Sequence, residues 1–214
     1  MKVIKQILLF NLFFFITIGL QSQTSIKAKI LLDEVSLQMN NYKNYEFNFK
    51  YVLENSKENI KQETKGQIIV MSEKYKISTI DIIQLFNGKK LYTIVPENEE
   101  VLITNPDQTN DFISNPTKLV KLYESGYDFY WDISQNIGGN NIQYIKLIPT
   151  EESLDVIYIL LGINMKTKNI YKLIEIGKQR TTTTLTIESL NINNDIPPSF
   201  FEFNEADYPG FYIN

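Results

Sequence analysis

The chain is expected to be a mainly β protein, in the form of an unclosed antiparallel β-barrel or strongly curved sheet with helices covering an apolar concave face. From Tyr45 onward, hydrophobic residues recur with a period of two in segments separated by short turn sequences. Helical spacing is confined to two short segments. A sheet of about ten to eleven strands has to curl, so its concave face is the place where helices bury their apolar sides.

Residues 1–22 have the pattern of a secretion signal. Lys2 and Lys5 form a positive n-region, and the apolar stretch 7–20 follows it. A membrane-spanning helix needs roughly 20 apolar residues, so this stretch is too short and too interrupted to be one. We expect cleavage near Ser22 and export of the remaining chain.

The composition restricts what the exported part can be. Residues 23–214 have the length of one domain, so a single domain is expected. The chain carries a net charge of −4, and it becomes more acidic when the signal is removed. Its lysines are scattered, so the sequence predicts no basic surface that could bind nucleic acid. It has no cysteine, so its stability has to come from the core and the protein cannot itself be acylated as a lipoprotein.

An amphipathic helix opens the exported part. Ser25 can cap it, and it is expected to run to 40–41. Its apolar residues recur near helical spacing: Ile30, Leu31, Val35 and Met39.

The clearest strand comes next. Aromatic and aliphatic residues alternate with polar ones, an alternation broken on the polar side only by Val52. The inward residues are Tyr45, Phe47, Phe49, Tyr51 and Leu53.

Further strands follow at short spacing. They are expected at 64–71, 74–79, 81–86, 90–95, 101–104, from 127 through 133, and at 142–148, 154–165, 170–176 and 181–190. Asn87-Gly88 predicts a type I′ hairpin, which needs positive φ at both positions. Gly138-Gly139 marks another turn, and Pro197-Pro198 ends the series.

The segment between the sixth and seventh expected strands does not continue the alternation of apolar and polar residues. Asn115-Pro116 places a capping side chain before a proline at the first helical position, and Gly126 stands where a helix ends. A short apolar stripe lies between them, so we expect a second helix that acts as a lid through Leu119, Leu122 and Tyr123.

The repertoire of catalytic side chains is small. Without histidine and cysteine, the usual general base, the thiol nucleophile and most metal sites are missing. The carboxylate pairs Glu99-Glu100 and Glu151-Glu152 lie in expected turns, and Asp128 and Asp132 point outward along a strand, so they are interpreted as solvated charges. We expect a protein that is not an enzyme, with no catalytic residues, cofactor or metal.

The apolar face of the expected sheet is the feature that indicates a binding function. The chain holds 13 Phe, 13 Tyr and 1 Trp, and two short helices are too little cover for a concave face of this size. Most of these side chains would also serve as core in any β protein. The residues expected to line a lipid-binding cavity are Leu32, Val35, Phe47, Phe49, Tyr51, Tyr75, Ile77 and Trp131.

The order and spacing of short motifs resemble the LolA family of periplasmic outer-membrane lipoprotein carriers, in its Bacteroidota form, over essentially the whole exported part. No single motif is specific. They are Ala28-x-x-x-Leu32-Asp33-x-Val35, Tyr45-x-Phe47-x-Phe49, Lys65-Gly66-x-Ile68, Lys74-Tyr75, Phe86-Asn87-Gly88-Lys89, Asn115-Pro116-x-Lys118-Leu119, Leu147-x-Pro149 and Tyr208-Pro209-Gly210.

The resemblance implies an unclosed barrel under a helical lid and a location in the periplasm. It implies acylated lipoproteins as cargo, an inner-membrane ABC-type lipoprotein-releasing complex as the loading partner, and an outer-membrane acceptor; a monomer is expected. The best-known members carry an arginine on the second or third strand that bonds to the lid. Ser72 stands at that position here, and Lys74 is the nearest cation.

Three other interpretations remain open. The chain is also consistent with a non-enzymatic envelope module that binds partners through its sheet, or with a general lipid-binding protein. A hydrolase acting on envelope lipids or glycans would need two carboxylates in one cleft.

Overall fold

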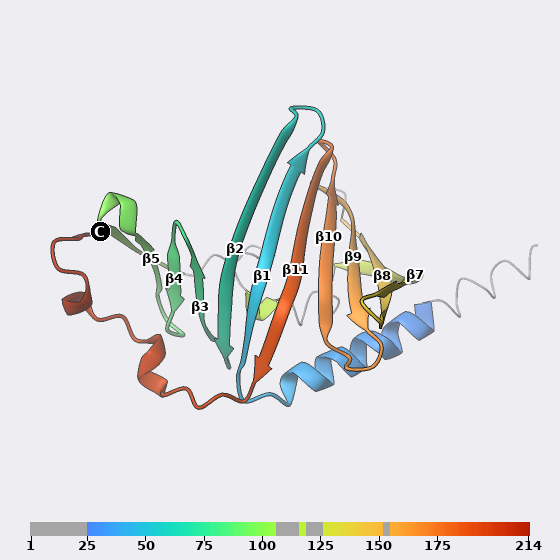
Figure 1. The fold of residues 1–214 in the computed structure, drawn as a ribbon, viewed down its shortest axis with the longest axis horizontal. Coiled ribbons are helices and arrows are strands. Elements are labelled where there is room, and N and C mark those ends of the chain that lie inside the picture. Colours follow the sequence, from blue (N-terminus) through green and yellow to red (C-terminus); the bar gives the residue numbers. More distant parts are fainter. Residues whose placement is uncertain (1–24, 106–115, 119–125, 152–154) are drawn as a thin grey trace, which may run out of the picture.

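The computed structural model describes residues 25–105, 116–118, 126–151 and 155–214. Over these ranges the chain forms one α-helix, at 25–40, and one twelve-stranded sheet that curves strongly and stays open (Figure 1). Four short 3₁₀ helices are also present: Pro96–Asn98, Pro116–Lys118, Pro198–Phe201 and Glu205–Asp207. The expected mainly β architecture, an unclosed curved sheet with helical cover, is therefore confirmed.

The sheet consists of two meanders. They are joined because the first strand of the chain pairs with the last long strand. Its order is β12-β6-β5-β4-β3-β2-β1-β11-β10-β9-β8-β7. The strands are β1 (Tyr45–Asn55), β2 (Ile60–Met71), β3 (Lys74–Thr79), β4 (Ile83–Phe86), β5 (Leu91–Val95), β6 (Glu100–Thr104), β7 (Tyr127–Ile137), β8 (Asn140–Pro149), β9 (Val156–Asn164), β10 (Ile170–Gly177), β11 (Thr181–Ile192) and β12 (Tyr212–Ile213). Neighbouring strands are antiparallel except β12, the strand that sequence analysis did not foresee, which pairs in parallel with β6.

The concave face of the sheet is apolar from one meander to the other. One row of facing residues crosses β2, β1, β11, β10, β9, β8 and β7 in turn: Thr64, Tyr51, Leu185, Leu173, Leu161, Ile145 and Trp131. Leu173 and Ile145 have no exposed surface, and Leu161 is also buried. Because alternate residues of a strand point to opposite sides, this row places the main core inside the curve.

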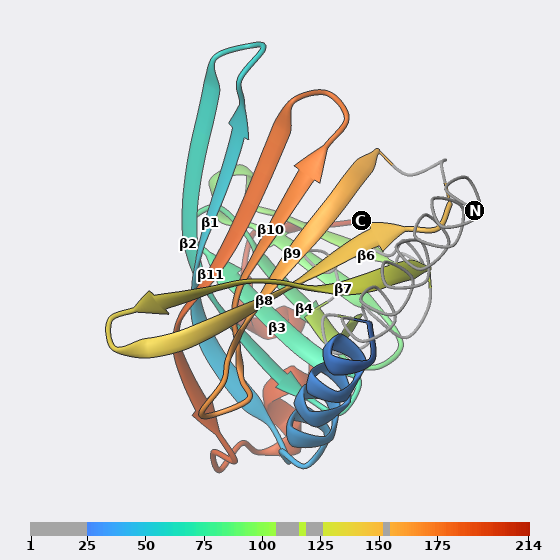
Figure 2. The ribbon, with the colours of Figure 1, turned by 90° about the vertical axis from the view of Figure 1, so that its right-hand side faces the viewer.

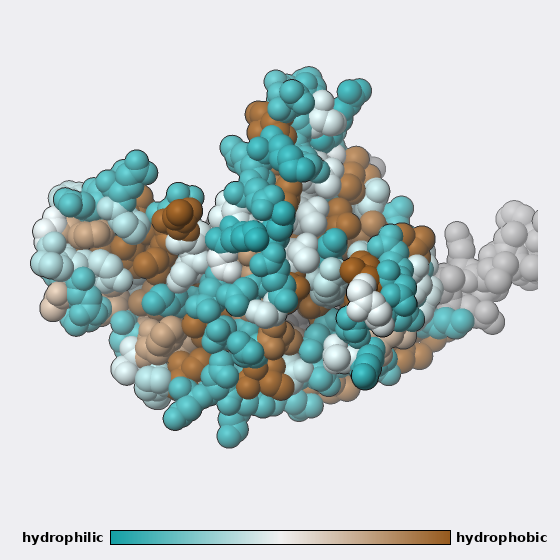
Figure 3. Space-filling view, in the orientation of Figure 1, coloured by the Kyte–Doolittle hydropathy of each residue, from teal (hydrophilic) through white to brown (hydrophobic). Residues whose placement is uncertain are grey.

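The opposite face of the central strands is hydrophilic. Lys50 and Glu63 form an ion pair of 2.8 Å across β1 and β2, and Lys61 and Glu54 form one of 2.6 Å. Figure 3 shows hydrophilic residues along the upper part of this hairpin. The alternation seen in the sequence of β1 thus separates an inner apolar side from an outer charged side.

The helix packs its apolar side into the main core. Its buried residues are Ala28, Leu31, Leu32, Val35 and Met39. Ile30, expected on this side, is 55% exposed and therefore lies outside the buried stripe, because the i, i+3, i+4 pattern that faces the sheet starts at Ala28. The helix crosses below the lower ends of β10, β9 and β8 (Figures 1 and 2), and Glu34 pairs with Lys168 of the β9–β10 loop at 2.6 Å.

A buried asparagine joins the end of the helix to the end of the last long strand. The Asn44 side chain donates to the carbonyl oxygen of Asn194 (2.8 Å) and accepts from the Asn194 backbone N–H (2.9 Å). Asn44 is only 5% exposed, so these bonds satisfy a polar group that would otherwise be costly to bury.

The two short turns differ from each other in type. Gly138 and Gly139 both have positive φ, 55° and 81°, and join β7 to β8. The Asn87-Gly88 hairpin is present, but its type I′ turn was a wrong prediction: only Gly88 has positive φ, and the Asn87 side chain accepts from the N–H groups of Lys89 and Lys90. The asparagine side chain thereby supports a longer loop in place of the tight turn.

A register shift in β7 changes which side chains face the core. Tyr127, Phe129 and Trp131 pack against the core as expected, but Ile133 is 52% exposed. The pairing with β8 shifts between Trp131 and Ser134, and the buried Gln143 amide donates to the carbonyl oxygens of Asp132 (2.7 Å) and Ile133 (3.2 Å). Such a bulge re-aims side chains, so the simple alternation fails at Ile133.

The chain after β11 forms a strap, residues 196–214, which packs on the outer face of the first meander and then joins its edge as β12. It runs from the end of β11 to the C-terminus beside β5 (Figure 1). Phe201 has no exposed surface and packs against Ile69 and Leu85. Phe203 stacks on Tyr92 with ring centroids 4.6 Å apart. A second, smaller core, which the sequence analysis did not foresee, therefore lies on the outer side of the sheet.

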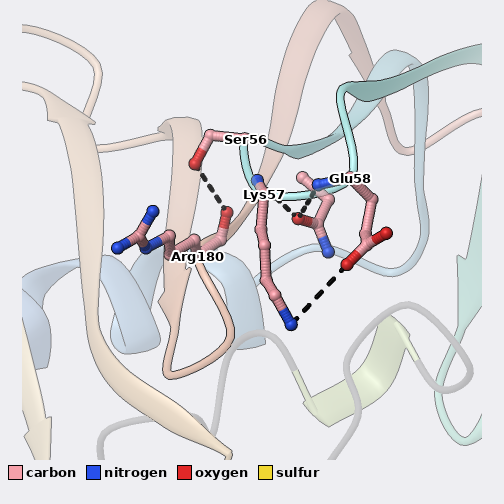
Figure 4. A network of polar contacts seen from close by, with 5 residues as sticks. Ser56, Lys57, Glu58 and Arg180 are labelled. Atoms are coloured by element: carbon pink, nitrogen blue, oxygen red, sulfur yellow. Dashed lines mark hydrogen bonds and ion pairs between the residues drawn. The ribbon is translucent and has the colours of Figure 1, made fainter.

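Two hairpin tips are tied together at the far end of the long strands (Figure 4). The backbone N–H of Ser56, between β1 and β2, donates to the carbonyl oxygen of Arg180, between β10 and β11, at 3.2 Å. The Asn55 side chain accepts from the N–H groups of Lys57 and Glu58 and shapes the first tip. These contacts extend the pairing of β1 with β11 into the turns.

Candidate functional site

A cavity of about 240 Å³ lies on the concave face beside the main core. Strands β1, β2, β3 and β11 supply most of its wall, and the β3–β4 turn, Gln84 of β4 and Pro116 complete it. Its lining residues are Phe47, Phe49, Tyr51, Thr64, Ile68, Ile77, Thr79, Asp81, Ile82, Gln84, Pro116 and Leu185.

Strand pairing explains why these residues meet. Phe47 of β1 faces Ile68 of β2, which faces Ile77 of β3. Further along β1, on the same face, Tyr51 faces Thr64 on one side and Leu185 on the other. Residues of one face lie in rows across the sheet, so positions far apart in the sequence form a continuous wall.

Gly66 gives the cavity its room between these two rows. It pairs with Phe49, and a Cβ at position 66 would lie 2.7 Å from Cζ of the Phe49 ring and would also contact the carbonyl oxygen of Ser78. The ring of Phe49 therefore lies over the bare backbone of Gly66. A side chain at position 66 would force the ring away from the sheet and toward the cavity.

Gly66→Ala is expected to lower the free energy of unfolding by about 1–3 kcal/mol, as overpacking does, and to weaken binding of an apolar ligand because the Phe49 ring moves into the cavity. Denaturant unfolding and a ligand titration would measure the two effects. Gly162→Ala is the matched control: a Cβ at position 162 would lie 2.9 Å from Cε1 of the Tyr144 ring, but on the outer face, so only stability should fall. Unchanged binding in Gly66→Ala would contradict this arrangement.

The structure divides the residues expected to line the cavity into two groups. Phe47, Phe49, Tyr51 and Ile77 line it. Leu32, Val35, Tyr75 and Trp131 do not line it and lie in the adjoining packed core, because the helix and β7 fill that part of the concave face. Both groups belong to one continuous apolar cluster.

The expected lid lies mostly outside the described residues. Leu119, Leu122 and Tyr123 lie in the segment 119–125, which the structure does not describe, so their role as a lid stays a prediction. Pro116, in the short 3₁₀ helix Pro116–Lys118, is buried and lines the cavity. Gly126 has the positive φ, 85°, that its expected role at a helix end requires.

Ser72 and Lys74 flank the turn between β2 and β3 but face different surroundings. Ser72, with φ of 55°, lines a polar cavity of about 220 Å³ together with Glu73, Tyr45 and Thr117. The ammonium group of Lys74 pairs with Glu202 of the strap at 2.9 Å, on the outer face. Among the described residues, the partner of Lys74 is therefore the strap.

Buried tyrosines surround the aromatic part of the core. Tyr75 is 1% exposed and lies 5.3 Å from the ring of Phe86. Burial raises the pKa of Tyr75 to about 12, from an ordinary value of 10.0. Burial, and then the nearby charge of Glu73, also raise the pKa of Tyr45 far above its usual range. The phenols are thus held neutral by the apolar core.

The free energy of unfolding is expected to fall as pH rises from about 10 to about 12. In this window the unfolded chain loses the Tyr75 proton while the folded protein keeps it, so the unfolded state binds fewer protons and is favoured by raising the pH. Urea unfolding at a series of pH values would give the slope. Tyr75→Phe should make the slope shallower; the same slope in both proteins would show that Tyr75 does not contribute.

Sequence reasoning missed the polar side of the cavity. Thr64 and Thr79 lie on the inner face of strands that were foreseen, so continuing the alternation from Ile68 and Ile77 would have found them. Gln84 could have been found in the same way, by continuing the alternation back from Phe86, whereas Asp81 lies in the turn between β3 and β4, where no alternation applies.

The cavity offers little chemistry. Within the described ranges there is no cluster of acidic side chains able to hold a metal ion and no buried side-chain polar atom without a hydrogen-bond partner. The same ranges contain no helix long and apolar enough to cross a membrane. What the site provides is an apolar wall with a polar margin, which suits the binding of an apolar chain.

Comparison with known proteins identifies the fold. No protein-family model and no curated protein matches the sequence. Among solved structures, an uncharacterized conserved protein from Thermus thermophilus is similar over 88% of this chain and 98% of its own, with a TM-score of 0.59 and 5% identity. A LolA superfamily protein from Nitrosomonas europaea (TM-score 0.43, 12% identity, 82% and 97% covered) and LprF from Mycobacterium bovis (0.45, 12%, 81% and 96%) are also similar. At such low identity these likenesses concern the fold alone, and the first of them shows that the open, curved sheet described here is shared with another protein along almost its entire length.

Proposed function

We propose that this protein carries the acyl chains of lipoproteins through the periplasm, from the inner membrane toward the outer membrane. The observation that carries the proposal is the apolar cavity on the inner side of an open sheet, walled by Phe47, Ile68 and Ile77. It faces the concave side, where an acyl chain would be screened from water.

The energetics of acyl chains favour such a site. Each methylene that leaves water for an apolar environment contributes about 0.8 kcal/mol, so a carrier needs a continuous apolar wall more than it needs specific bonds. The cavity of about 240 Å³ is slightly smaller than the roughly 300–1,000 Å³ of sites for drug-sized ligands. It therefore holds part of one chain, and an anchor with several chains requires the cavity to widen.

The wall contains an element that can move without breaking the sheet. Pro116 lies outside the strands and their hairpin turns, so displacing it leaves every ladder of hydrogen bonds intact. We infer that loading moves this part of the wall outward. The lid formed by Leu119, Leu122 and Tyr123 belongs to the same proposal.

The proposal includes partners and a location. The sequence has no nucleotide-binding motif, so the energy for loading comes from an inner-membrane ABC-type lipoprotein-releasing complex, and an outer-membrane acceptor receives the cargo. Residues 1–22 direct export, and the carrier acts as a monomer. It does no chemistry on its cargo, in line with the lack of histidine and cysteine.

Native mass spectrometry tests the proposal. Protein expressed with residues 1–22 in a Gram-negative host and purified from the periplasm is expected to carry acyl-chain adducts on a monomer and to begin near Gln23. A spectrum without adducts, obtained also after co-expression of a lipoprotein, would contradict the carrier function. That result would favour a module that binds partners through its sheet.

A further inference from the structure

The polarity of the cavity changes along the β1–β2–β3 wall. At one end the facing residues are apolar and buried: Phe47, Ile68 and Ile77 are 2%, 4% and 6% exposed. Toward the other end the wall becomes polar, with the hydroxyl groups of Thr64 and Thr79. A ligand with one apolar and one polar end therefore has a preferred orientation, with its chain toward Phe47 and its head group toward the threonines.

A carboxylate stands at the polar end. Asp81 lies in the turn between β3 and β4, and this turn is held by Thr79: its hydroxyl oxygen accepts from the N–H groups of Ile82 (3.1 Å) and Asp81 (3.3 Å), and its N–H donates to the carbonyl oxygen of Ile82 (2.9 Å). Asp81 itself is exposed. The turn geometry keeps this negative charge at the rim of the cavity.

No cation balances this charge in the described wall. Of the lining residues in the described ranges, Asp81 is the only charged one; the polar lining residues Thr64, Thr79 and Gln84 are neutral, and Gln84 faces Ile77. The Thr64 hydroxyl and the Gln84 amide can donate and accept hydrogen bonds to ester or amide groups, whereas the Thr79 hydroxyl already donates to the carbonyl oxygen of Ile82 at 3.2 Å. An anionic head group at the same place would be repelled by Asp81, and none of the described lining residues is a lysine or arginine.

We propose that the cavity selects acyl chains by head-group charge: it accepts chains attached through uncharged ester or amide groups and rejects free fatty acids and lipids with anionic phosphate heads. Asp81 is the residue that determines this specificity. The inference rests on the proposed carrier function. Selection by charge lets the carrier distinguish the ester- and amide-linked anchor of a lipoprotein from the phospholipids that surround it, because Asp81 repels the anionic ligand.

The experiment uses one chain with three head groups. The probes are cis-parinaric acid, its primary amide and the corresponding primary amine, titrated by fluorescence into the purified protein at about pH 8. Because Asp81 is exposed and screened, we expect the acid to bind about fivefold more weakly than the amide at low salt, which corresponds to about 1 kcal/mol, and the difference to shrink at high salt. The amine is expected to bind at least as tightly as the amide.

Variants at position 81 isolate the cause. Asp81→Asn should make the acid and the amide bind equally, and Asp81→Lys should reverse their order. Asp195→Asn is the control, because it removes one exposed negative charge that does not line the cavity. Circular dichroism would verify that each variant is folded.

The outcomes separate the two proposals. If the amide binds and the acid binds equally well to the unaltered protein, or if Asp81→Asn leaves their ratio unchanged, head-group selection is wrong while the carrier function stands. If none of the three probes binds, the carrier function itself is contradicted.

Discussion

Phe49→Glu is expected to abolish binding of acyl chains, with a loss of affinity of at least about 100-fold. Phe49 is 6% exposed and its ring forms the cavity wall above Gly66. A carboxylate at this place would have to lose its water without gaining a partner, because the neighbouring wall is apolar, and a ligand entering the cavity would complete that desolvation. Titration with a fluorescent acyl amide would measure the loss.

Asn48→Glu is the matched control. Asn48 precedes Phe49 in β1, points to the outer face, is exposed and donates to the Ser189 hydroxyl at 2.8 Å. The same new charge should change binding by less than about twofold there, since exposed substitutions far from a site have small effects. Normal binding by a folded Phe49→Glu protein would remove Phe49 from the site.

A second variant keeps the test conclusive if Phe49→Glu does not fold. Ile82→Glu adds the charge on the β3–β4 turn, at a half-buried lining position outside the strands. It should remain folded by circular dichroism and thermal melting and should also lose affinity. A folded Ile82→Glu protein with full affinity would contradict the assigned cavity.

Phe201→Ala is expected to lower the free energy of unfolding by about 3–5 kcal/mol, the range for removing a buried aromatic side chain. Phe201 has no exposed surface, packs on Ile69 and Leu85, and contacts the Phe200 ring edge-to-face at 5.1 Å. For a domain of this size the melting temperature should fall by about 10 °C. Denaturant unfolding and calorimetry would measure both quantities.

The control in the same strap is Tyr212→Ala. Tyr212 is 67% exposed, so its removal should change stability by less than about 0.5 kcal/mol. The Phe201→Ala protein, measured at a temperature where it is folded, should bind acyl chains normally because Phe201 lies on the opposite side of the sheet from the cavity. Unaltered stability of Phe201→Ala would mean that the strap is not part of the folded core.

Local patterns were sufficient to predict most strands and the side of each that faces inward. The alternation from Tyr45 to Leu53 predicted both the strand and the inner positions of Phe47, Phe49 and Tyr51. The prediction failed where the backbone departs from a regular pleat, as at Ile133 after the shift in register. A bulge depends on which strand lies alongside, and that information is not local.

The choice of buried face on the helix shows a similar limit. Helical spacing alone allowed Ile30 to be inside, but the structure buries Ala28 and Leu32 and leaves Ile30 and Leu37 exposed. A small residue such as Ala28 lets the helix approach the sheet closely, and a search for large apolar residues overlooks it. Which face of the helix is buried depends on the part of the sheet that it packs against.

The sequence by itself determined a signal-like N-terminus, a succession of alternating strands, an apolar inner face and the lack of histidine and cysteine. Only the tertiary structure decided that β1 pairs with β11, which brings Leu185 beside Tyr51, that Asp81 stands at the rim of the cavity, and that the strap covers the outer face of the first meander. The physical reason is that the alternation of apolar and polar side chains along a strand depends on that strand's own residues. The pairing of distant strands depends instead on the total apolar surface that the whole sheet buries.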